Sequence, residues 1–184
     1  MDNRKITIRQ TSNSDLEDVL DINRQAFGEE DVAGLVDGLL KDATAQPLLS
    51  LLALIEDKPA GYILFTRATL EGQTDQPGIQ ILAPLAIKPE FQKQGIGGKL
   101  IEEGISQLKK SGTELVFVLG HETYYPRHGF IPDAKSMGFP ATYPIPEKNK
   151  DAWMIYPLVK DALNGTSGKV ICADFMNRPE YWRE

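Results

Sequence analysis

The chain has 184 residues, close to the usual length of one domain, and its 41% hydrophobic and 25% charged residues are ordinary for a globular protein. Its 20 basic and 26 acidic side chains give a net charge of −6. This balance disfavours nonspecific binding to nucleic acid, where neutralisation of phosphates dominates affinity, and it mildly favours cationic partners.

The single cysteine and the absence of long apolar stretches argue against a disulfide-bonded, secreted or membrane-spanning protein. Cys172 is the only cysteine, so neither an internal disulfide nor a multi-cysteine metal site can form. Residues 1–9 lack the apolar core of a secretion signal. The longest apolar run, residues 48–55, is far shorter than the roughly 20 residues that a membrane-spanning helix needs. We expect a cytoplasmic protein that uses no metal and acts away from membranes.

The first part of the chain predicts a strand followed by two helices. Residues 5–9 alternate apolar and polar side chains, which is typical of a half-buried strand. Ser14, with Glu17 three residues later, is the pattern of a helix N-cap, and apolar residues then recur on one helical face until Gly28. A second helical pattern covers residues 31–41.

The rest of the chain predicts strands around one crossover helix. A strand at 79–87, a helix at 95–110 and a buried strand at 115–119 form a strand, helix, parallel strand unit, and Gly112 marks the helix stop. The other predicted elements are strands at 48–56 and 60–69 joined by a hairpin turn at 57–59, a short helix at 122–128, a strand at 153–159 and an apolar run at 170–175. Without repeats or long linkers, residues 1–184 are expected to form a single domain.

A glycine-rich turn before the crossover helix has the features of an anion-binding site. Gly95, Gly97 and Gly98 leave successive backbone N–H groups free of side chains at the positive end of a helix. Lys93 and Lys99 add positive charge. The alternative is a tight turn that only starts the helix.

This turn excludes two nucleotide-binding motifs and matches a different pattern. The Walker motif fails because Leu100 stands where serine or threonine is required, and the dinucleotide fingerprint lacks its last glycine. The segment instead reads Gln-x-x-Gly-x-Gly at Gln92, Gly95 and Gly97, after an apolar strand and Lys-Pro-Glu. It resembles the coenzyme A pyrophosphate loop of the GNAT superfamily of N-acetyltransferases.

A second motif carries the same resemblance. Residues 124–130 read Tyr-Tyr-Pro-Arg-His-Gly-Phe and are similar to the family's aromatic pair, short helix and Gly-Phe ending. The element order follows the family plan over residues 5–159, which leaves 160–184 as a C-terminal extension. The resemblance implies an α/β fold: a mixed, mostly antiparallel sheet, splayed at the coenzyme-binding strands, with helices on both faces. Pro84 agrees with a splayed strand, because a proline in a sheet marks a bulge or an edge.

The resemblance also implies the residues of the site. The splayed strand would bond the pantetheine arm through its backbone, and the loop would hold the pyrophosphate. The coenzyme-binding residues that it implies are Leu85, Ala86, Ile87, Gln92, Lys93, Gln94, Gly95, Ile96, Gly97, Gly98 and Lys99. Tyr125, four residues before Gly129, takes the family's general-acid position near the coenzyme sulfur. Tyr124 is expected to pack.

The implied reaction is direct transfer of an acetyl group from acetyl-CoA to a primary amine while both substrates are bound. His121 follows the strand at 115–119 and is a candidate general base, because a histidine side chain suits proton transfer near neutral pH. A surface histidine is the alternative. The acidic residues at 29–31 suit a cationic amine, and they equally suit the dipole at the start of a helix.

One other class of function competes with the enzyme. A noncatalytic acyl-CoA-binding or sensor domain would keep the pyrophosphate loop without turnover, although Tyr125 favours the enzyme. The sequence leaves the acceptor amine and the oligomeric state open, with a homodimer as one alternative.

Overall fold

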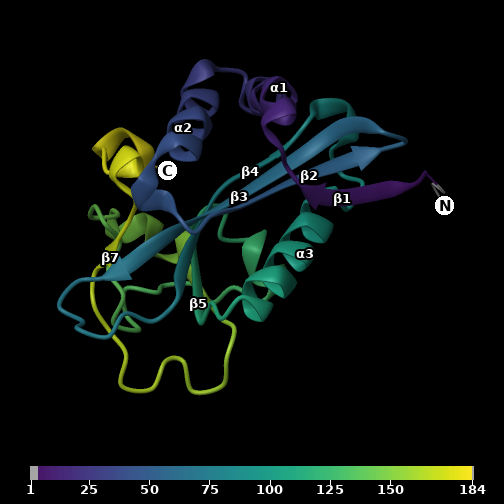
Figure 1. Cartoon of the computed structure of the whole chain (residues 1–184). Coiled ribbons are helices and arrows are strands. Elements are labelled where there is room, and N and C mark those ends of the chain that lie inside the picture. Colours follow the sequence, from purple (N-terminus) through teal and green to yellow (C-terminus); the bar gives the residue numbers. More distant parts are fainter. Residues whose placement is uncertain (1–3, 184) are drawn as a thin grey trace.

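Strands rich in apolar residues form a seven-stranded sheet in the computed structural model, which describes residues 4–183 (Figure 1). The strands follow the order β1-β2-β3-β4-β5-β6, and β7 pairs with the end of β3. Among the described strands, β4 and β5 form the one parallel pair, so the sheet is mixed and mostly antiparallel, as expected. The strands are β1 Ile6–Gln10, β2 Leu49–Ile55, β3 Lys58–Leu70, β4 Ile79–Ile87, β5 Leu115–Leu119, β6 Trp153–Pro157 and β7 Val170–Ile171.

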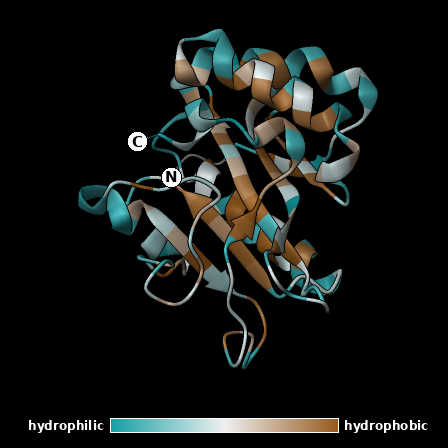
Figure 2. Ribbon diagram, turned by 90° about the vertical axis from the view of Figure 1, so that its left-hand side faces the viewer, coloured by the Kyte–Doolittle hydropathy of each residue, from teal (hydrophilic) through white to brown (hydrophobic). Residues whose placement is uncertain are grey.

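Helices cover both faces of the sheet. Helices α1 (Leu16–Phe27) and α2 (Glu30–Lys41) pack on one face, where the sheet contributes residues such as Tyr62 and Leu64 to the core. Helix α3 (Ile96–Lys110) packs on the other face. Figure 2 shows the strands mostly brown and the helices divided between brown and teal, as amphipathic helices require. Within residues 4–183, no helix combines the length and apolarity needed to cross a bilayer.

Short 3₁₀ helices connect these elements. They are η1 Asn13–Asp15, η2 Ala43–Ala45, η3 Pro89–Phe91, η4 Tyr125–His128, η5 Glu147–Ala152, η6 Asp174–Met176 and η7 Pro179–Trp182. The short helix predicted at 122–128 is therefore η4, one 3₁₀ turn at the end of that range.

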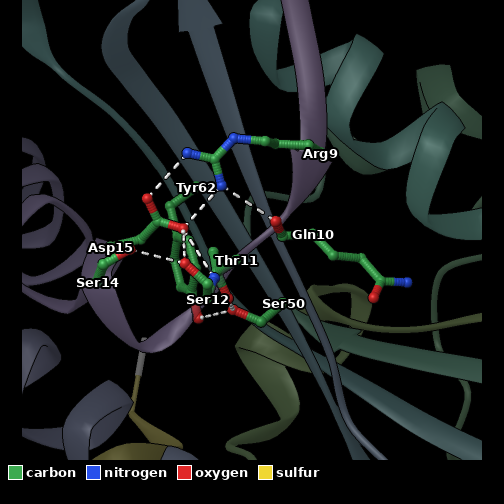
Figure 3. A network of polar contacts seen from close by, with 8 residues as sticks. All are labelled: Arg9, Gln10, Thr11, Ser12, Ser14, Asp15, Ser50 and Tyr62. Carbon is green, nitrogen blue, oxygen red and sulfur yellow. Dashed lines mark hydrogen bonds and ion pairs between the residues drawn. The ribbon is translucent and has the colours of Figure 1, made fainter.

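A polar network fixes the start of α1 and differs from the predicted cap (Figure 3). Asp15, rather than Ser14, precedes the first helical residue. The Asp15 carboxylate accepts bonds from the Arg9 guanidinium at 2.7 and 2.9 Å and from the Ser12 backbone N–H at 2.7 Å. The predicted cap of Ser14 with Glu17 was wrong because the 3₁₀ turn η1 precedes α1. The Asp15 side chain at the end of that turn accepts the bond from the Ser12 backbone N–H.

Replacing Asp15 with asparagine should lower the free energy of unfolding by roughly 1–3 kcal/mol at pH 7, the usual range for losing charge-assisted hydrogen bonds. Arg9, followed by the Ser12 backbone, holds the pKa of the buried Asp15 carboxyl well below its usual value. This stabilisation is present above the unfolded pKa near ~4 and declines as the pH falls toward the folded value. Urea unfolding should show a smaller advantage of the wild type over D15N at pH 3 than at pH 7, because the carboxyl is by then partly protonated in the unfolded chain. Equal stabilities at pH 7 would contradict the role.

The β2–β3 hairpin turns one residue earlier than predicted. Glu56 and Asp57 both have positive φ, 48° and 66°, and form a two-residue turn, so that Ile55 pairs with Lys58. Pro59 consequently lies inside β3, where it faces Leu54 beside a register shift in β2. Two-residue turns with positive φ match the twist of paired strands, which explains why this turn forms instead of the predicted 57–59 turn.

The C-terminal residues complete the core under α1 and α2. Trp182 is 5% exposed and meets Trp153 edge to face, with ring centroids 5.6 Å apart. The Phe175 ring fills the space where Gly38 of α2 has no side chain. The thiol of Cys172 is buried nearby. The predicted C-terminal extension is therefore integrated with the sheet and helices.

Candidate active site

The parallel strands β4 and β5 part in the middle of β4. Their ladder ends at Leu82 and Val118, whereas β4 continues to Ile87 with pairing to β3 alone. Ala83 and Pro84 together oppose the single residue Leu64 of β3, which is a β-bulge. The stretch 83–87, whose outer edge has no β5 partner, is called the β4–β5 opening below. It has the place and the form that the splayed strand was expected to have.

Alternation decides which backbone groups of β4 face this opening. The N–H of Lys88 donates to the carbonyl of Ala60 on β3 at 2.9 Å. In an antiparallel ladder neighbouring residues point to opposite sides, so Ala86 also turns its backbone to β3. The N–H and C=O groups of Leu85 and Ile87 then face the opening. One of them, the Ile87 carbonyl, accepts a bond from the Gln92 side chain at 3.1 Å.

Helix α3 starts beside this opening without a side-chain cap. Gly95 is the N-cap residue, with φ of 80°, and Lys99 makes the first bond back to its carbonyl at 3.2 Å. Within residues 4–183, no acceptor is bonded to the N–H groups of Ile96, Gly97 and Gly98. Three free donors at the positive end of a 15-residue helix form a cradle for an anion.

Tyr124 lies between this cradle and the end of β4. A carbon at the Cβ position of Gly97 would stand 2.5 Å from the Tyr124 hydroxyl oxygen and 3.6 Å from Cδ2 of Leu85. The Arg127 guanidinium lies 5.3 Å from the centre of the Tyr124 ring. Burial raises the pKa of the Tyr124 phenol, and the charge of Arg127 opposes this shift. The ring packs as expected, but its hydroxyl rests against the start of α3.

Tyr125 is buried at the carboxyl end of β5. Its ring occupies the space over Gly120, which has no side chain, and meets Phe130 edge to face at a centroid distance of 5.5 Å. Its backbone N–H and that of Tyr124 donate to the carbonyl of His121 at 3.4 and 3.1 Å. The two tyrosine rings also meet edge to face, 5.2 Å apart. The aromatic pair thus packs just past the end of β5, and Tyr124 is the member of the pair that reaches Gly97 beside Leu85 of β4.

A groove of about 490 Å³ continues from the cradle along α3. The His128 ring covers Gly98, where a Cβ carbon would stand 2.8 Å from Cε1 of the imidazole. Burial lowers the pKa of His128, and the nearby charge of Arg127 lowers it further. The groove is lined by Gly95, Gly98, Lys99, Ile101, Glu102, Ile105, Arg127, His128 and Tyr156. The positive charges of Lys99 and Arg127 suit phosphate groups, and the rings of His128 and Tyr156 suit a nucleotide base. Glu102 is the one acidic residue in the lining.

Most of the predicted site residues lie close together around the end of β4 and the start of α3, but some have exposed side chains. The side chains of Lys93 and His121 are exposed. Gln94 bonds to Arg4 at 2.6 Å and to the Glu90 carbonyl at 3.1 Å, so its side chain braces the loop. Gly97 lies next to Leu85 of β4, whereas Gly95 and Gly98 line the groove along α3.

Sequence reasoning missed two features of this region. The Lys88 ammonium, at the end of β4, pairs with Asp21 of α1 at 3.2 Å and ties the helix to the splayed strand. Arg127 and His128 reach the α3 groove from η4. The only sequence signal for the position of His128 is Gly98, whose missing side chain leaves room for the imidazole ring. The two residues are 30 positions apart, so spacing alone does not connect them.

Comparison with known proteins agrees with this geometry. A family model described as an acetyltransferase (GNAT) domain matches residues 48–132. The chain is 51% identical over 168 residues to the uncharacterized N-acetyltransferase YjhQ of Escherichia coli K12, covering 91% of this chain and 92% of the relative. It is 30% identical over 159 residues to the uncharacterized N-acetyltransferase YhbS of the same strain, covering 84% and 89%.

Two solved structures share the fold. The crystal structure of Escherichia coli YhbS in complex with CoA superposes with a TM-score of 0.85 at 27% identity, covering 97% of this chain and 95% of that one. A GNAT acetyltransferase from Brucella melitensis in complex with acetyl-CoA gives a TM-score of 0.73 at 25% identity, covering 94% and 98%. With its parted strands, glycine cradle and aromatic pair, this chain belongs to the GNAT family of N-acetyltransferases.

Proposed function

We propose that this protein transfers an acetyl group from acetyl-CoA to a primary amine by direct attack, with both substrates bound together. The observation that carries the proposal is the β4–β5 opening beside the uncapped start of α3. An unpaired strand edge can bond an amide-rich arm, and free helix N–H groups can bind the phosphates attached to it. The CoA and acetyl-CoA complexes of the two similar structures support this assignment.

The chain offers a distinct set of groups to each part of the coenzyme. The N–H groups of Ile96, Gly97 and Gly98 would hold the pyrophosphate, with Lys93 and Lys99 adding charge from the rim. The backbone of Leu85 would bond the pantetheine amides. The Ile87 carbonyl already accepts a bond from Gln92, and the Ile87 N–H would face the acetyl end of the coenzyme. The nucleotide end would follow the α3 groove past Arg127 and His128. This set keeps the predicted strand and loop and adds the two residues of η4. Of the predicted residues, Ala86 turns its backbone to β3, and the side chains of Gln92 and Gln94 bond to backbone carbonyls of the chain itself.

Transfer itself requires alignment of the amine, stabilisation of charge on the carbonyl oxygen and protonation of the departing sulfur. The backbone N–H of Ile87 faces the opening and is the proposed donor to the oxygen. Tyr125, at the carboxyl end of β5, is the proposed acid for the sulfur. His121 is the proposed base, and its exposed position lets it exchange the accepted proton with water.

Acetyl-CoA should raise the midpoint of thermal unfolding, whereas ATP at the same concentration should not. A ligand that binds only the folded state stabilises it by RT ln(1 + [L]/Kd), about 2.7 kcal/mol at 100 times Kd. ATP has phosphates for the cradle but no pantetheine arm for the edge of β4. A thermal-shift titration measures both. No response to saturating acetyl-CoA, or an equal response to ATP, would contradict the proposed site.

Turnover separates the enzyme from a noncatalytic acyl-CoA-binding domain. We would screen primary amines, amino acids and peptide N-termini for release of free coenzyme thiol. If the protein binds acetyl-CoA but no acceptor raises thiol release above the rate of acetyl-CoA hydrolysis, the noncatalytic sensor domain would be favoured. The acidic residues of α2 make cationic amines the first acceptors to try, although Glu30 already pairs with Arg24 at 2.8 Å.

A further inference from the structure

A second cavity, of about 300 Å³, lies on the sheet face opposite α3 and is lined by apolar residues and three lysines. Its buried walls, which include Trp153, belong to the core under α1 and α2. The coenzyme-site residues Leu85, Ile87 and Tyr124 pack with the core under α3 instead. The cavity is therefore separate from the coenzyme groove, and its size falls at the lower end of the range for small-molecule sites.

Segments distant in the sequence build this cavity and are locked to one another. The Ala134 N–H donates to the carbonyl of Trp153 at 2.9 Å, and the Val170 N–H donates to the carbonyl of Pro140 at 2.8 Å. The Trp153 indole N–H donates to the carbonyl of Phe139 at 2.8 Å, and its ring stacks on Phe117 at 5.2 Å. These bonds hold the walls in place, so a ligand would bind without ordering a loop.

The rim of this cavity is positively charged, whereas the whole protein carries a net negative charge. Lys135, Lys150 and Lys169 line the cavity, and no acidic residue does, although the net charge of the chain is −6. Lys150 shares its charge with Asp133 at 3.9 Å and Glu147 at 3.5 Å. Within residues 4–183, no carboxylate lies within ion-pair distance of Lys135 or Lys169.

We propose that this cavity binds a small organic anion, a carboxylate or phosphate ester with an apolar body. The apolar part would lie against Pro140, Pro144 and Ile145, above the buried Trp153. The anionic head would meet Lys135 and Lys169 at the rim. A cationic rim over an apolar floor binds such a ligand because each part of the ligand meets surface of matching chemistry. This site does not depend on the proposed transfer reaction.

Calorimetric titration with phenylacetate, phenylacetamide and acetate tests both requirements. Wild-type protein should bind phenylacetate at least about tenfold more tightly than the amide, which lacks the charge, and than acetate, which lacks the apolar body. The K135Q/K169Q variant should lose about tenfold or more of its affinity for phenylacetate. K148Q removes an exposed lysine that does not line the cavity and should bind like the wild type.

Coenzyme A affinity and the unfolding midpoint should be unchanged in both variants, which separates loss of this site from loss of the fold or of the coenzyme site. Equal affinity for phenylacetate and phenylacetamide, equal losses in K135Q/K169Q and K148Q, or no binding by the wild type would overturn the proposal.

Discussion

Replacing Tyr125 with phenylalanine is expected to lower turnover by about 10²–10⁴-fold, the usual contribution of general acid catalysis, with little change in acetyl-CoA affinity. The substitution deletes only the hydroxyl that would protonate the departing sulfur. The ring keeps its place over Gly120 and its edge-to-face contact with Phe130. Steady-state rates with an acceptor found by screening, together with calorimetric affinity for acetyl-CoA, would measure the two effects separately.

Two further phenylalanine substitutions make this test specific. Tyr181→Phe removes a hydroxyl from the C-terminal segment, far from the opening in sequence and on the other face of the sheet, and should leave the rate unchanged. Tyr124→Phe removes the hydroxyl that rests against Gly97 and should act on coenzyme affinity before it acts on turnover. If Tyr125→Phe retains full turnover while Tyr124→Phe loses it, the roles of the two tyrosines are exchanged.

Replacing Gly97 with glutamate should abolish measurable binding of coenzyme A. Gly97 is buried in the first turn of α3, and the space of its missing side chain is occupied by the Tyr124 hydroxyl. A glutamate would fill the cradle, displace Tyr124 and place a negative charge at the proposed pyrophosphate site. Calorimetry measures the affinity, and circular dichroism reports whether the protein is folded.

Gly34→Glu is the matched control for this substitution. It introduces the same charge on α2 at an exposed glycine with no atom within 4 Å of its Cβ position, and it should bind coenzyme A like the wild type. If a folded Gly97→Glu protein kept its affinity, the start of α3 would not be the phosphate site.

Most of the fold could be predicted because its signals are local. The β4, α3, β5 unit follows from three apolar segments and from glycines at either end of the helix, and its predicted bounds agree with the structure almost to the residue. The start of α1 could not be predicted in this way. Ser14 fits a cap pattern, but Asp15 bonds to Arg9 across the turn, and that contact exists only after β1 and α1 are placed.

In the candidate site, too, local features could be predicted from the sequence and long-range contacts could not. The Gln92 to Gly98 loop is contiguous and can be identified from spacing, whereas the contact of Tyr124 with Gly97 joins positions 27 apart in the sequence. It depends on where β4 and β5 part, which a sequence pattern suggests only through Pro84. The lysine-lined cavity is harder still to predict, because its walls come from segments far apart in the sequence that meet through backbone and side-chain bonds formed only in the folded chain.

The placement of β7, Phe175 and Trp182 has a consequence for how the chain forms during translation. Among residues 4–183, the core under α3 includes nothing after Leu158, whereas the core under α1 and α2 includes Val170, Met176 and Trp182. During translation, the surface around Trp153 and α2 is therefore expected to stay open to chaperones until the last residues emerge and the whole domain can close.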